Sequence, residues 1–351
     1  MPRLNRPFSK IVFFAFGIDA KTGERVGPRG SGFFLSRPST DAPGLCHYYA
    51  VTNWHVAVQG MWSQIRVNIL DGESRFIPLS PDDWHYERDG ADLAIADVTD
   101  WLDVETDDVE MLPEHFLLTK DWAKFAGLEL GEDVFMIGMY ANVSASNRNS
   151  PAARFGSLSR PADDQAPLKA GINGAMRPAH LLDMRSRTGF SGSPVFVYRD
   201  EDCFAREAYI EGEGWIDNQM TESRKSMGPG RLHPSLLGIH CSQFNEPVEI
   251  LAVESEDEAL RAPIHEGDRL VIPSSMTIAV PSWDVKALLD QAHFEEIRQM
   301  RDRGRRDKGF EIPQPESAPE PTTKADNPSH KEDFNSLLTS VARGKKPAGQ
   351  T

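Results

Sequence analysis

Short apolar runs alternate with turns along most of this chain, and the pattern predicts β-strands. Between residues 8 and 118, and again between 130 and 281, apolar or alternating runs are separated by Gly, Pro and Asp. The runs that we predict as strands are 11–16, 33–35, 48–52, 65–70 and 93–98 in the first region and 134–137, 155–159, 195–198 and 236–239 in the second. The sequence therefore predicts two all-β units in succession.

The pattern changes after Pro281, where apolar residues recur at helical spacing. These residues are Val285, Leu288, Leu289 and Ala292. Ser282 is placed as the N-cap and Asp284 falls in the first turn. We predict a helix over about 282–303 that packs its apolar face on the second β unit.

Beyond residue 307 the chain is rich in Pro, Glu, Ser and Thr, a composition that buries too little apolar surface to order itself. We predict a disordered tail over 307–351. Within it, the segment 333–343 has the spacing of a short amphipathic helix, with apolar positions Phe334, Leu337, Leu338 and Val341. Such a helix is too short to be stable alone, so the tail is predicted to bind a protein partner. A chance cluster in a disordered tail is the open alternative.

Charge and cysteine content narrow the function classes. The formal net charge is −15, which argues against a nucleic-acid partner because phosphate binding needs a concentrated basic surface. Cys46, Cys203 and Cys241 lack the paired spacing of a disulfide framework or a metal site. Phosphate-binding glycine loops, dinucleotide fingerprints and His/Glu metal motifs are absent from the sequence, so we expect neither a metal nor another cofactor.

The apolar run 11–16 is too short to span a membrane, and no small-residue cleavage site follows it. The expectation is a cytoplasmic protein that does not bind membranes.

A serine between two glycines is the clearest candidate for chemistry, in the stretch Gly189-Phe190-Ser191-Gly192. The glycines allow a turn that exposes the hydroxyl of Ser191. The amides of Gly189 and Ser191 then converge on one point, as an oxyanion hole requires. A serine hydroxyl is a poor nucleophile at neutral pH, so it needs a base and a group that orients the base.

Both groups are found upstream. His55 follows the strand predicted at 48–52 and is the candidate base, while Asp92 opens an apolar strand and is the candidate orienting group. Asp89 and Asp97 are alternatives to Asp92, but Asp89 precedes a glycine in a predicted turn and Asp97 follows the apolar residues of the strand. The chain order His, Asp, Ser fits the chymotrypsin-type arrangement and not that of the α/β hydrolases.

With these motifs the chain resembles the trypsin-like serine peptidases, most closely their bacterial, disulfide-free branch. Supporting segments are 30–35 before the histidine, 131–138 at the start of the second unit, 236–240 at the pocket wall and 278–282 before the helix. The resemblance covers roughly the first 300 residues. It implies an all-β fold of two six-stranded-type barrels, about 8–118 and 130–281, with a C-terminal helix, all within a peptidase domain over 1–300.

The resemblance implies a serine endopeptidase acting on a protein or peptide substrate. Ser191 is then the nucleophile, His55 the general base and Asp92 the group that orients it, with Gly189 and Ser191 as the oxyanion hole. One position departs from the family pattern, since Phe190 stands where Asp or Asn is common. Phe190 cannot pair with a new N-terminal amine, which implies either an enzyme without a zymogen step or an oxyanion loop that is collapsed until something orders it.

The sequence Gly-Ile-His at 238–240 resembles the V8-type glutamyl endopeptidases. In that group, the pocket histidine and a small hydroxyl residue five before the nucleophile hold the substrate carboxylate. The implied pocket residues are Arg185, Ser186, Thr188, Gly238 and His240, with Arg187 nearby. They imply a preference for Glu or Asp at the cleaved residue. The alternative is that His240 caps a strand and the arginines face water.

A second class of function also stays open. A protease-fold interaction or regulatory protein retains the same three residues, uses them poorly and binds a protein partner. Phe190, the long polar insertions and the tail motivate this alternative.

Overall fold

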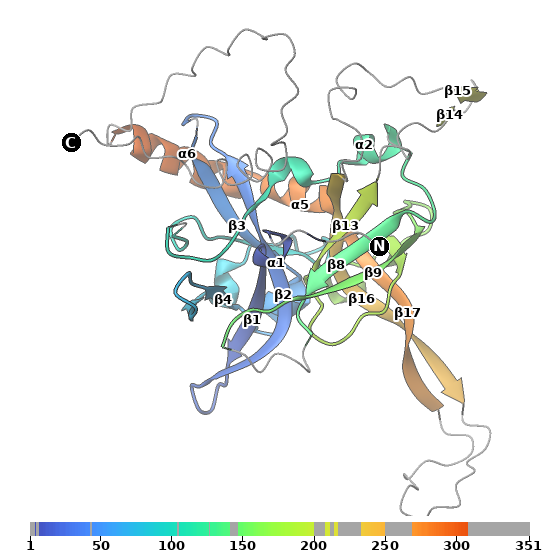
Figure 1. Ribbon diagram of the computed structural model, residues 1–351, viewed down its shortest axis with the longest axis horizontal. Coiled ribbons are helices and arrows are strands. Elements are labelled where there is room, and N and C mark those ends of the chain that lie inside the picture. The colour runs from blue at the N-terminus through green and yellow to red at the C-terminus, as the bar shows by residue number, and fades with distance from the viewer. Residues whose placement is uncertain are drawn as a thin grey trace, which may run out of the picture.

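The computed structural model describes residue 4 and residues 7–307, except 43, 104, 126, 141–146, 200–207, 211–213, 217–232 and 250–268. The predicted tail after residue 307, its helical motif at 333–343 and Cys203 lie outside the described residues. The described chain is mostly β, with a closed six-stranded barrel, a second sheet and helices near the C-terminus (Figure 1). The predicted all-β class with a closing helix is therefore confirmed.

The first unit is a sheet whose strands pair in the order β5-β4-β1-β2-β3-β6, with β7 parallel to β2. Its strands are β1 (Val12–Ile18), β2 (Arg25–Pro38), β3 (Cys46–Thr52), β4 (Gln64–Asn68), β5 (Ser74–Ile77), β6 (Ala94–Asp97) and β7 (Leu112–Pro113). Phe13, Phe34 and Ile65 are fully buried in one cluster between these strands. This cluster is the core of the first unit.

The second unit is a barrel that closes in the order β12-β17-β16-β13-β8-β9. Its strands are β8 (Asp133–Gly138), β9 (Ala152–Arg160), β12 (His180–Asp183), β13 (Pro194–Arg199), β16 (His233–Glu249) and β17 (Arg269–Pro281). Apolar side chains from these strands fill its interior, among them Met136, Leu158, Leu182 and Val195. Closure leaves this β unit without open sheet edges along its barrel strands.

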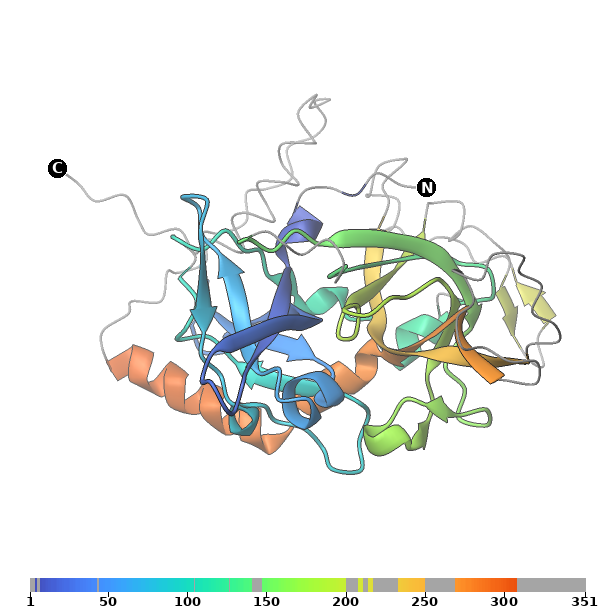
Figure 2. The same cartoon turned by 90° about the horizontal axis from the view of Figure 1, so that it is seen from below.

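The described chain also contains short elements. Among them are α1 (Pro7–Lys10), α2 (Lys120–Phe125), β10 (Leu168–Lys169), β11 (Met176–Arg177), β14 (Ala208–Ile210), β15 (Gly214–Ile216) and the 3-10 turns η2 (Pro81–Asp83), η3 (Glu114–Phe116) and η5 (Ile172–Gly174). The first sheet and the barrel lie side by side in both views, and the β16–β17 hairpin projects beyond the barrel (Figures 1 and 2).

The helical stretch after Pro281 differs from its prediction in two ways. It divides into α5 (Ser282–Leu289) and α6 (Ala292–Asp307). Pro281 occupies the cap position of α5, while the Ser282 hydroxyl donates to the Leu118 carbonyl oxygen at 2.8 Å. The predicted N-cap role of Ser282 is therefore wrong, because a buried carbonyl from a distant segment accepts its hydroxyl proton.

The two helices also contact different units. α5 packs on β16 and β17, as predicted, whereas α6 runs along the first sheet (Figure 2). The Phe294 ring of α6 is buried and meets the Tyr49 ring edge-on, with 5.4 Å between centroids. The prediction that the helix docks on the second unit holds only for α5.

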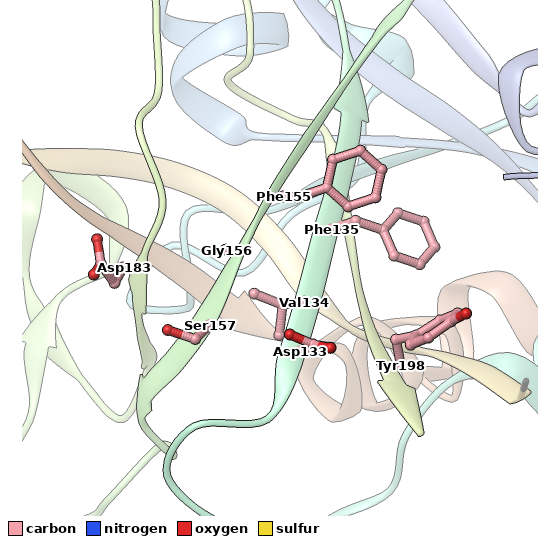
Figure 3. A pocket seen from close by; sticks show the side chains of 8 residues that line it. All are labelled: Asp133, Val134, Phe135, Phe155, Gly156, Ser157, Asp183 and Tyr198. Atoms are coloured by element: carbon pink, nitrogen blue, oxygen red, sulfur yellow. The ribbon is translucent and has the colours of Figure 1, made fainter. Parts of the chain in front are cut away.

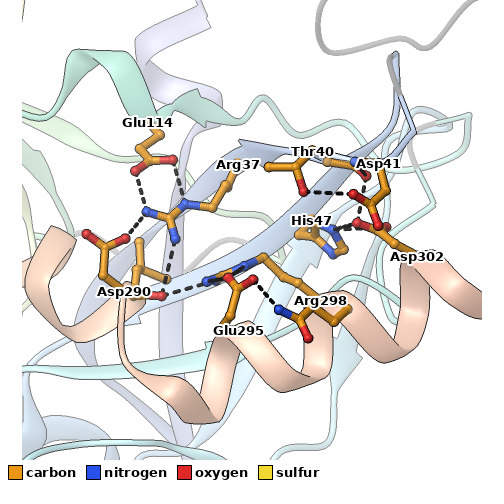
Figure 4. Close-up of polar contacts among 12 residues, drawn as sticks. Arg37, Thr40, Asp41, His47, Glu114, Asp290, Glu295, Arg298 and Asp302 are labelled. Atoms are coloured by element: carbon orange, nitrogen blue, oxygen red, sulfur yellow. Dashed lines mark hydrogen bonds and ion pairs between the residues drawn. The ribbon is translucent and has the colours of Figure 1, made fainter.

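Polar contacts fasten this helical region to the first sheet (Figure 4). Arg37 of β2 donates to both carboxylate oxygens of Glu114, one from Nε and one from Nη2. Its Nη2 also contacts the carboxylate of Asp290, which lies between the helices. Asp302 accepts a hydrogen bond from Ser39 at 2.7 Å, and Arg301 pairs with Asp97 at 2.9 Å. Arg301 thus binds α6 to the first sheet.

Candidate active site

His55 and Asp92 are in direct contact. Nδ1 of His55 lies 2.5 Å from Oδ2 of Asp92, and the main-chain N–H of His55 donates to Oδ1 of the same carboxylate at 2.9 Å. His55 begins a single π-helical turn, η1 (His55–Gln59), directly after β3, and Asp92 precedes β6. The carboxylate side chain is 11% exposed and the imidazole 34%, so the ring reaches solvent while its partner is held inside.

Other groups hold Asp92 in place from both units. The Asn53 side-chain amide donates to the Asp92 carbonyl oxygen at 2.8 Å, and the Asp92 N–H donates to the Ala170 carbonyl oxygen at 2.8 Å. Asn53 is fully buried and belongs to the first unit, whereas Ala170 follows β10 near the second. Asp92 therefore lies where the two units meet. The rival Asp97 instead pairs with Arg301.

The candidate nucleophile lies in two consecutive turns between β12 and β13. The Phe190 N–H donates to the Arg187 carbonyl oxygen at 3.2 Å, and the Ser193 N–H donates to the Phe190 carbonyl oxygen at 2.9 Å. The third residue of each turn is a glycine with positive φ, 103° at Gly189 and 86° at Gly192. Glycine adopts this backbone conformation at low cost, which explains both glycines of the motif.

The second of these turns packs tightly against the first unit. A Cβ on Gly192 would come 1.9 Å from the Ser31 carbonyl oxygen and 2.3 Å from Oγ1 of Thr52. Thr52 ends β3 and lies three residues before His55. The Ser191 turn is thus held close to the strand end that leads into His55.

The two amides predicted to form the oxyanion hole are free to donate a hydrogen bond to a ligand. The N–H groups of Gly189 and Ser191 donate to no acceptor in the part of the chain that the structure describes. The Ser191 side chain is half-buried, and no described residue forms a hydrogen bond with its hydroxyl. Nucleophile–base hydrogen bonds are often long in free enzymes and tighten when substrate binds.

Phe190 is fully buried in the cluster that fills the second barrel. The Arg154 guanidinium lies over its ring at 5.7 Å from the centroid. An apolar side chain inside the barrel therefore fixes the residue before Ser191 by packing.

His240 lies beside the Ser191 turn. Its carbonyl oxygen accepts the Gly192 N–H at 2.9 Å, and its own N–H donates to the Ser193 carbonyl oxygen at 3.0 Å. The imidazole is 3% exposed, and neither ring nitrogen has a hydrogen-bond partner in the described chain. Burial, and secondly the nearby His55, lower the pKa of His240 to about 4. His240 is thus a neutral, buried and unpartnered polar group next to the candidate nucleophile.

The other predicted pocket residues differ in burial. Gly238 lies on β16 opposite Pro281, and Ser186 is buried. Arg185 and Thr188 are exposed, as is Arg187. The described contacts bring neither Arg185 nor Thr188 to His240.

Two neighbours of the site were missed by the sequence reasoning. Asn53, inside the Thr-Asn-Trp-His motif, orients the Asp92 backbone. Ser31 contacts the nucleophile turn from β2. The motif around each residue was visible, but the contact partners lie far away along the chain. Cys241 follows His240 and is buried, and burial, and then the charge of Asp92, raise the pKa of its thiol.

A cavity of about 320 Å³ lies on the second barrel, away from these residues (Figure 3). Its lining includes Phe135, Phe155 and Tyr198 with the carboxylates of Asp133 and Asp183. None of the candidate catalytic residues lines it. Across the described residues, no group of three His, Cys, Asp or Glu side chains is placed to hold a metal ion. Within the same residues, every helix is too short or too polar to cross a membrane.

Neither a protein-family model nor a curated protein matches this sequence. Among solved structures, the chain is similar to the Rv3671c protease in an inactive form, with 13% identity and a TM-score of 0.38 over 81% of this chain and 88% of that one. It is also similar to an inactive serine-to-alanine mutant of Rv3671c from M. tuberculosis H37Rv, with 12% identity and a TM-score of 0.35 over 80% and 87% of the two chains. Both likenesses are distant.

Proposed function

We propose that this protein is a serine endopeptidase that cleaves peptide bonds through an acyl-enzyme. The contact between His55 Nδ1 and Asp92 Oδ2, at 2.5 Å, carries this proposal. A carboxylate at Nδ1 holds the proton on that nitrogen, which leaves the Nε2 lone pair free to accept a proton. We propose that this imidazole acts on Ser191, because a serine hydroxyl is activated by an adjacent base that a third group orients.

The reaction then proceeds in two halves. Oγ of Ser191 attacks the scissile carbonyl carbon while its proton passes to Nε2 of His55. His55 returns that proton to the leaving amine, and the C–N bond breaks to leave an ester on Ser191. A water molecule, deprotonated by the same imidazole, hydrolyses the ester. Asp92 stabilises the imidazolium that forms in each half.

The free amides of Gly189 and Ser191 are the groups that we propose stabilise the transition state. The carbonyl oxygen gains negative charge as the tetrahedral intermediate forms, and the N–H groups of Gly189 and Ser191 are the proposed donors to it. Because neither amide is used inside the described chain, both remain available. One such donor is worth about 10²–10³ in kcat.

We further propose a preference for acidic residues at the cleaved position. His240 supports this proposal, because both ring nitrogens are buried without a partner beside the Ser191 turn. A buried unpartnered polar group is costly, and a substrate carboxylate that binds it removes that cost. The exposed side chains of Arg185 and Arg187 add a cationic field to the region before the nucleophile.

The deciding experiment is covalent labelling with a fluorophosphonate probe, with Ser191→Ala as control. The wild-type protein is expected to be labelled once, at Ser191, and to hydrolyse peptides. Ser191→Ala is expected to do neither while keeping its melting temperature, because a half-exposed hydroxyl contributes little to packing. A wild-type protein that stays unlabelled but binds a protein partner saturably favours the regulatory alternative.

A further inference from the structure

Ser31 is a buried serine of β2 that joins three segments around the candidate active site. Its N–H donates to the Ser191 carbonyl oxygen at 2.8 Å, and its hydroxyl donates to the Gly189 carbonyl oxygen at 2.7 Å. The same hydroxyl accepts the Met139 N–H at 2.8 Å. Its carbonyl oxygen accepts the Thr52 hydroxyl at 2.6 Å. One residue of the first unit thereby binds the nucleophile turn, the end of β8 and the end of β3.

The glycines on both sides of Ser31 are packed tightly within the first unit. A Cβ on Gly30 would come 2.5 Å from a methyl group of Val56, and a Cβ on Gly32 would come 2.1 Å from the Phe13 ring. The side chain of Ser31 is fully buried. The first unit therefore requires glycine at both flanking positions, and Ser31 between them supplies the buried hydroxyl that reaches the nucleophile turn.

The Ser31 hydroxyl orients one peptide group of the nucleophile turn. Its hydrogen bond to Gly189 fixes the plane of the peptide between Gly189 and Phe190. Phe190 is fully buried on the other side of that peptide, so the turn that leads to the Ser191 N–H is held on both sides. Without the donor, the Gly189 carbonyl and the Met139 N–H are both buried without partners, and a glycine backbone turns easily to find new ones.

We propose that Ser31 is a positioning residue for the oxyanion hole. Its hydroxyl keeps the Gly189 carbonyl turned toward the first unit, so that the Gly189 and Ser191 N–H groups stay directed at the reacting carbonyl. This inference rests on the proposed peptidase function for its kinetic consequence, but its structural part does not depend on activity.

The structural part is tested by hydrogen exchange in Ser31→Ala, followed by mass spectrometry on peptides covering 136–140 and 187–193. Both segments are expected to exchange at least tenfold faster than in the wild type. Ser282→Ala is the matched control, because it also removes a fully buried serine hydroxyl that donates to a backbone carbonyl, at 2.8 Å. It is expected to leave both segments unchanged. If exchange over 187–193 is the same in Ser31→Ala as in the wild type, the proposal is wrong whatever the activity.

The kinetic part separates positioning from general stability. In Ser31→Ala, kcat is expected to fall roughly 10- to 100-fold with KM nearly constant, because the oxyanion forms only in the transition state. Affinity for a peptide boronate should fall by a similar factor. A loss carried by KM, or an equal loss in Ser282→Ala, would overturn the inference. Ser31→Cys, which keeps the volume with a weak donor, is expected to fall in between and provides a second variant if Ser31→Ala folds poorly. If the wild type neither hydrolyses nor labels, the peptidase proposal fails, while the exchange result still decides the role of Ser31 in the turn.

Discussion

Because Gly138 has no side chain, the side chains of Phe190 and Ser193 pack directly against its backbone. A Cβ on Gly138 would come 3.0 Å from Cδ1 of Phe190 and 1.8 Å from Oγ of Ser193. The end of β8 therefore forms the floor beneath the nucleophile turn, and its shape depends on the absence of one methyl group.

Gly138→Ala is accordingly expected to displace the turn, because a buried overlap of this size cannot be absorbed without backbone movement. We expect kcat to fall at least tenfold and the free energy of unfolding to fall by about 1–3 kcal/mol, measured by peptide hydrolysis and urea denaturation. Gly304→Ala, on α6 with no atom within 4 Å of the new methyl group, is the control. It is expected to leave activity unchanged and to raise stability by up to about 1 kcal/mol. Wild-type kcat in Gly138→Ala would show that the turn is not supported by β8.

The second prediction concerns the carboxylate beside His55. Asp92→Asn is expected to reduce kcat by about 10³- to 10⁴-fold with little change in fold, because the amide stabilises the wrong imidazole tautomer. Asp97→Asn removes the competing carboxylate, which pairs with Arg301 on α6. It is expected to lower the melting temperature but not kcat. The opposite pattern of losses would reassign the orienting role to Asp97.

The third prediction concerns the specificity attributed to His240. Peptides with Glu at the cleaved position are expected to exceed matched Gln peptides in kcat/KM, and His240→Ala should reduce that ratio at least tenfold. His240 is neutral in the free protein, with a pKa of about 4, so an anionic side chain that raises this pKa above the pH binds with uptake of a proton. The Glu-to-Gln ratio should therefore rise as pH falls from 8 to 6, by up to about tenfold per unit. A preference for Lys, Arg or large apolar residues in a peptide library contradicts this proposal.

The fourth prediction concerns acid stability. Burial lowers the pKa of His180 to about 3 and, with the nearby His55, that of His240 to about 4. The unfolded chain, with ordinary values near 6.5, binds these protons first as pH falls. Their contribution is thus complete above about pH 6.5 and is lost as pH falls toward 4 and 3. Asp284 has the opposite effect on stability as pH falls, because burial raises its folded-state pKa to about 6, so that the folded protein binds this proton before the unfolded chain does.

His180→Asn isolates the contribution of His180 to the loss of stability in acid. The Nδ1 atom of His180 accepts the Ala162 N–H at 3.1 Å, and an asparagine oxygen can accept in its place without titrating. Between pH 4 and 6 the variant should lose free energy of unfolding less steeply than the wild type, by about 1.4 kcal/mol per pH unit. Urea denaturation across this range measures the slope. Equal slopes would mean that His180 is protonated in the folded protein.

The fifth prediction separates α6 from the tail. Deleting residues 308–351 is expected to leave peptide hydrolysis and melting temperature unchanged, and to weaken recovery of a protein partner in pull-downs. Phe294→Ala is expected to cost about 3–5 kcal/mol, because its buried ring packs on Tyr49 and His85. If the 308–351 deletion loses stability or cleavage, the tail belongs to the peptidase fold.

These results show which parts of the site follow from local sequence. His55, Asp92 and Ser191 stand in short motifs whose glycines, β-branched residues and chain order carry the information. The strands around them are also local patterns, so their existence could be predicted. The ends of the strands could not be predicted in the same way. For example, β2 begins at Arg25, well before the predicted start at residue 33. That extension is stabilised by pairing with β1, which no local pattern expresses.

Contacts between distant segments could not be predicted in this way. The Arg298 side chain donates to the Tyr49 hydroxyl across 249 positions of the chain, and Ser31 reaches Gly189 across 158. An arginine within a predicted helix needs no distant partner to explain it, and a serine between glycines has a local explanation in a turn. The folded arrangement gives each a second partner that only three-dimensional structure reveals.

The position of α6 also affects the order in which the protein becomes functional during synthesis. The ribosome makes the first sheet early, but the helix that covers Tyr49 is the last described element to be completed. The 249 positions between Tyr49 and Arg298 take on the order of 10–50 s to translate. During that interval the nascent chain carries His55 and Asp92 without the helix that stabilises their unit. If the proposed function holds, we therefore expect a ribosome-bound chain to show no peptidase activity until α6 emerges from the ribosome.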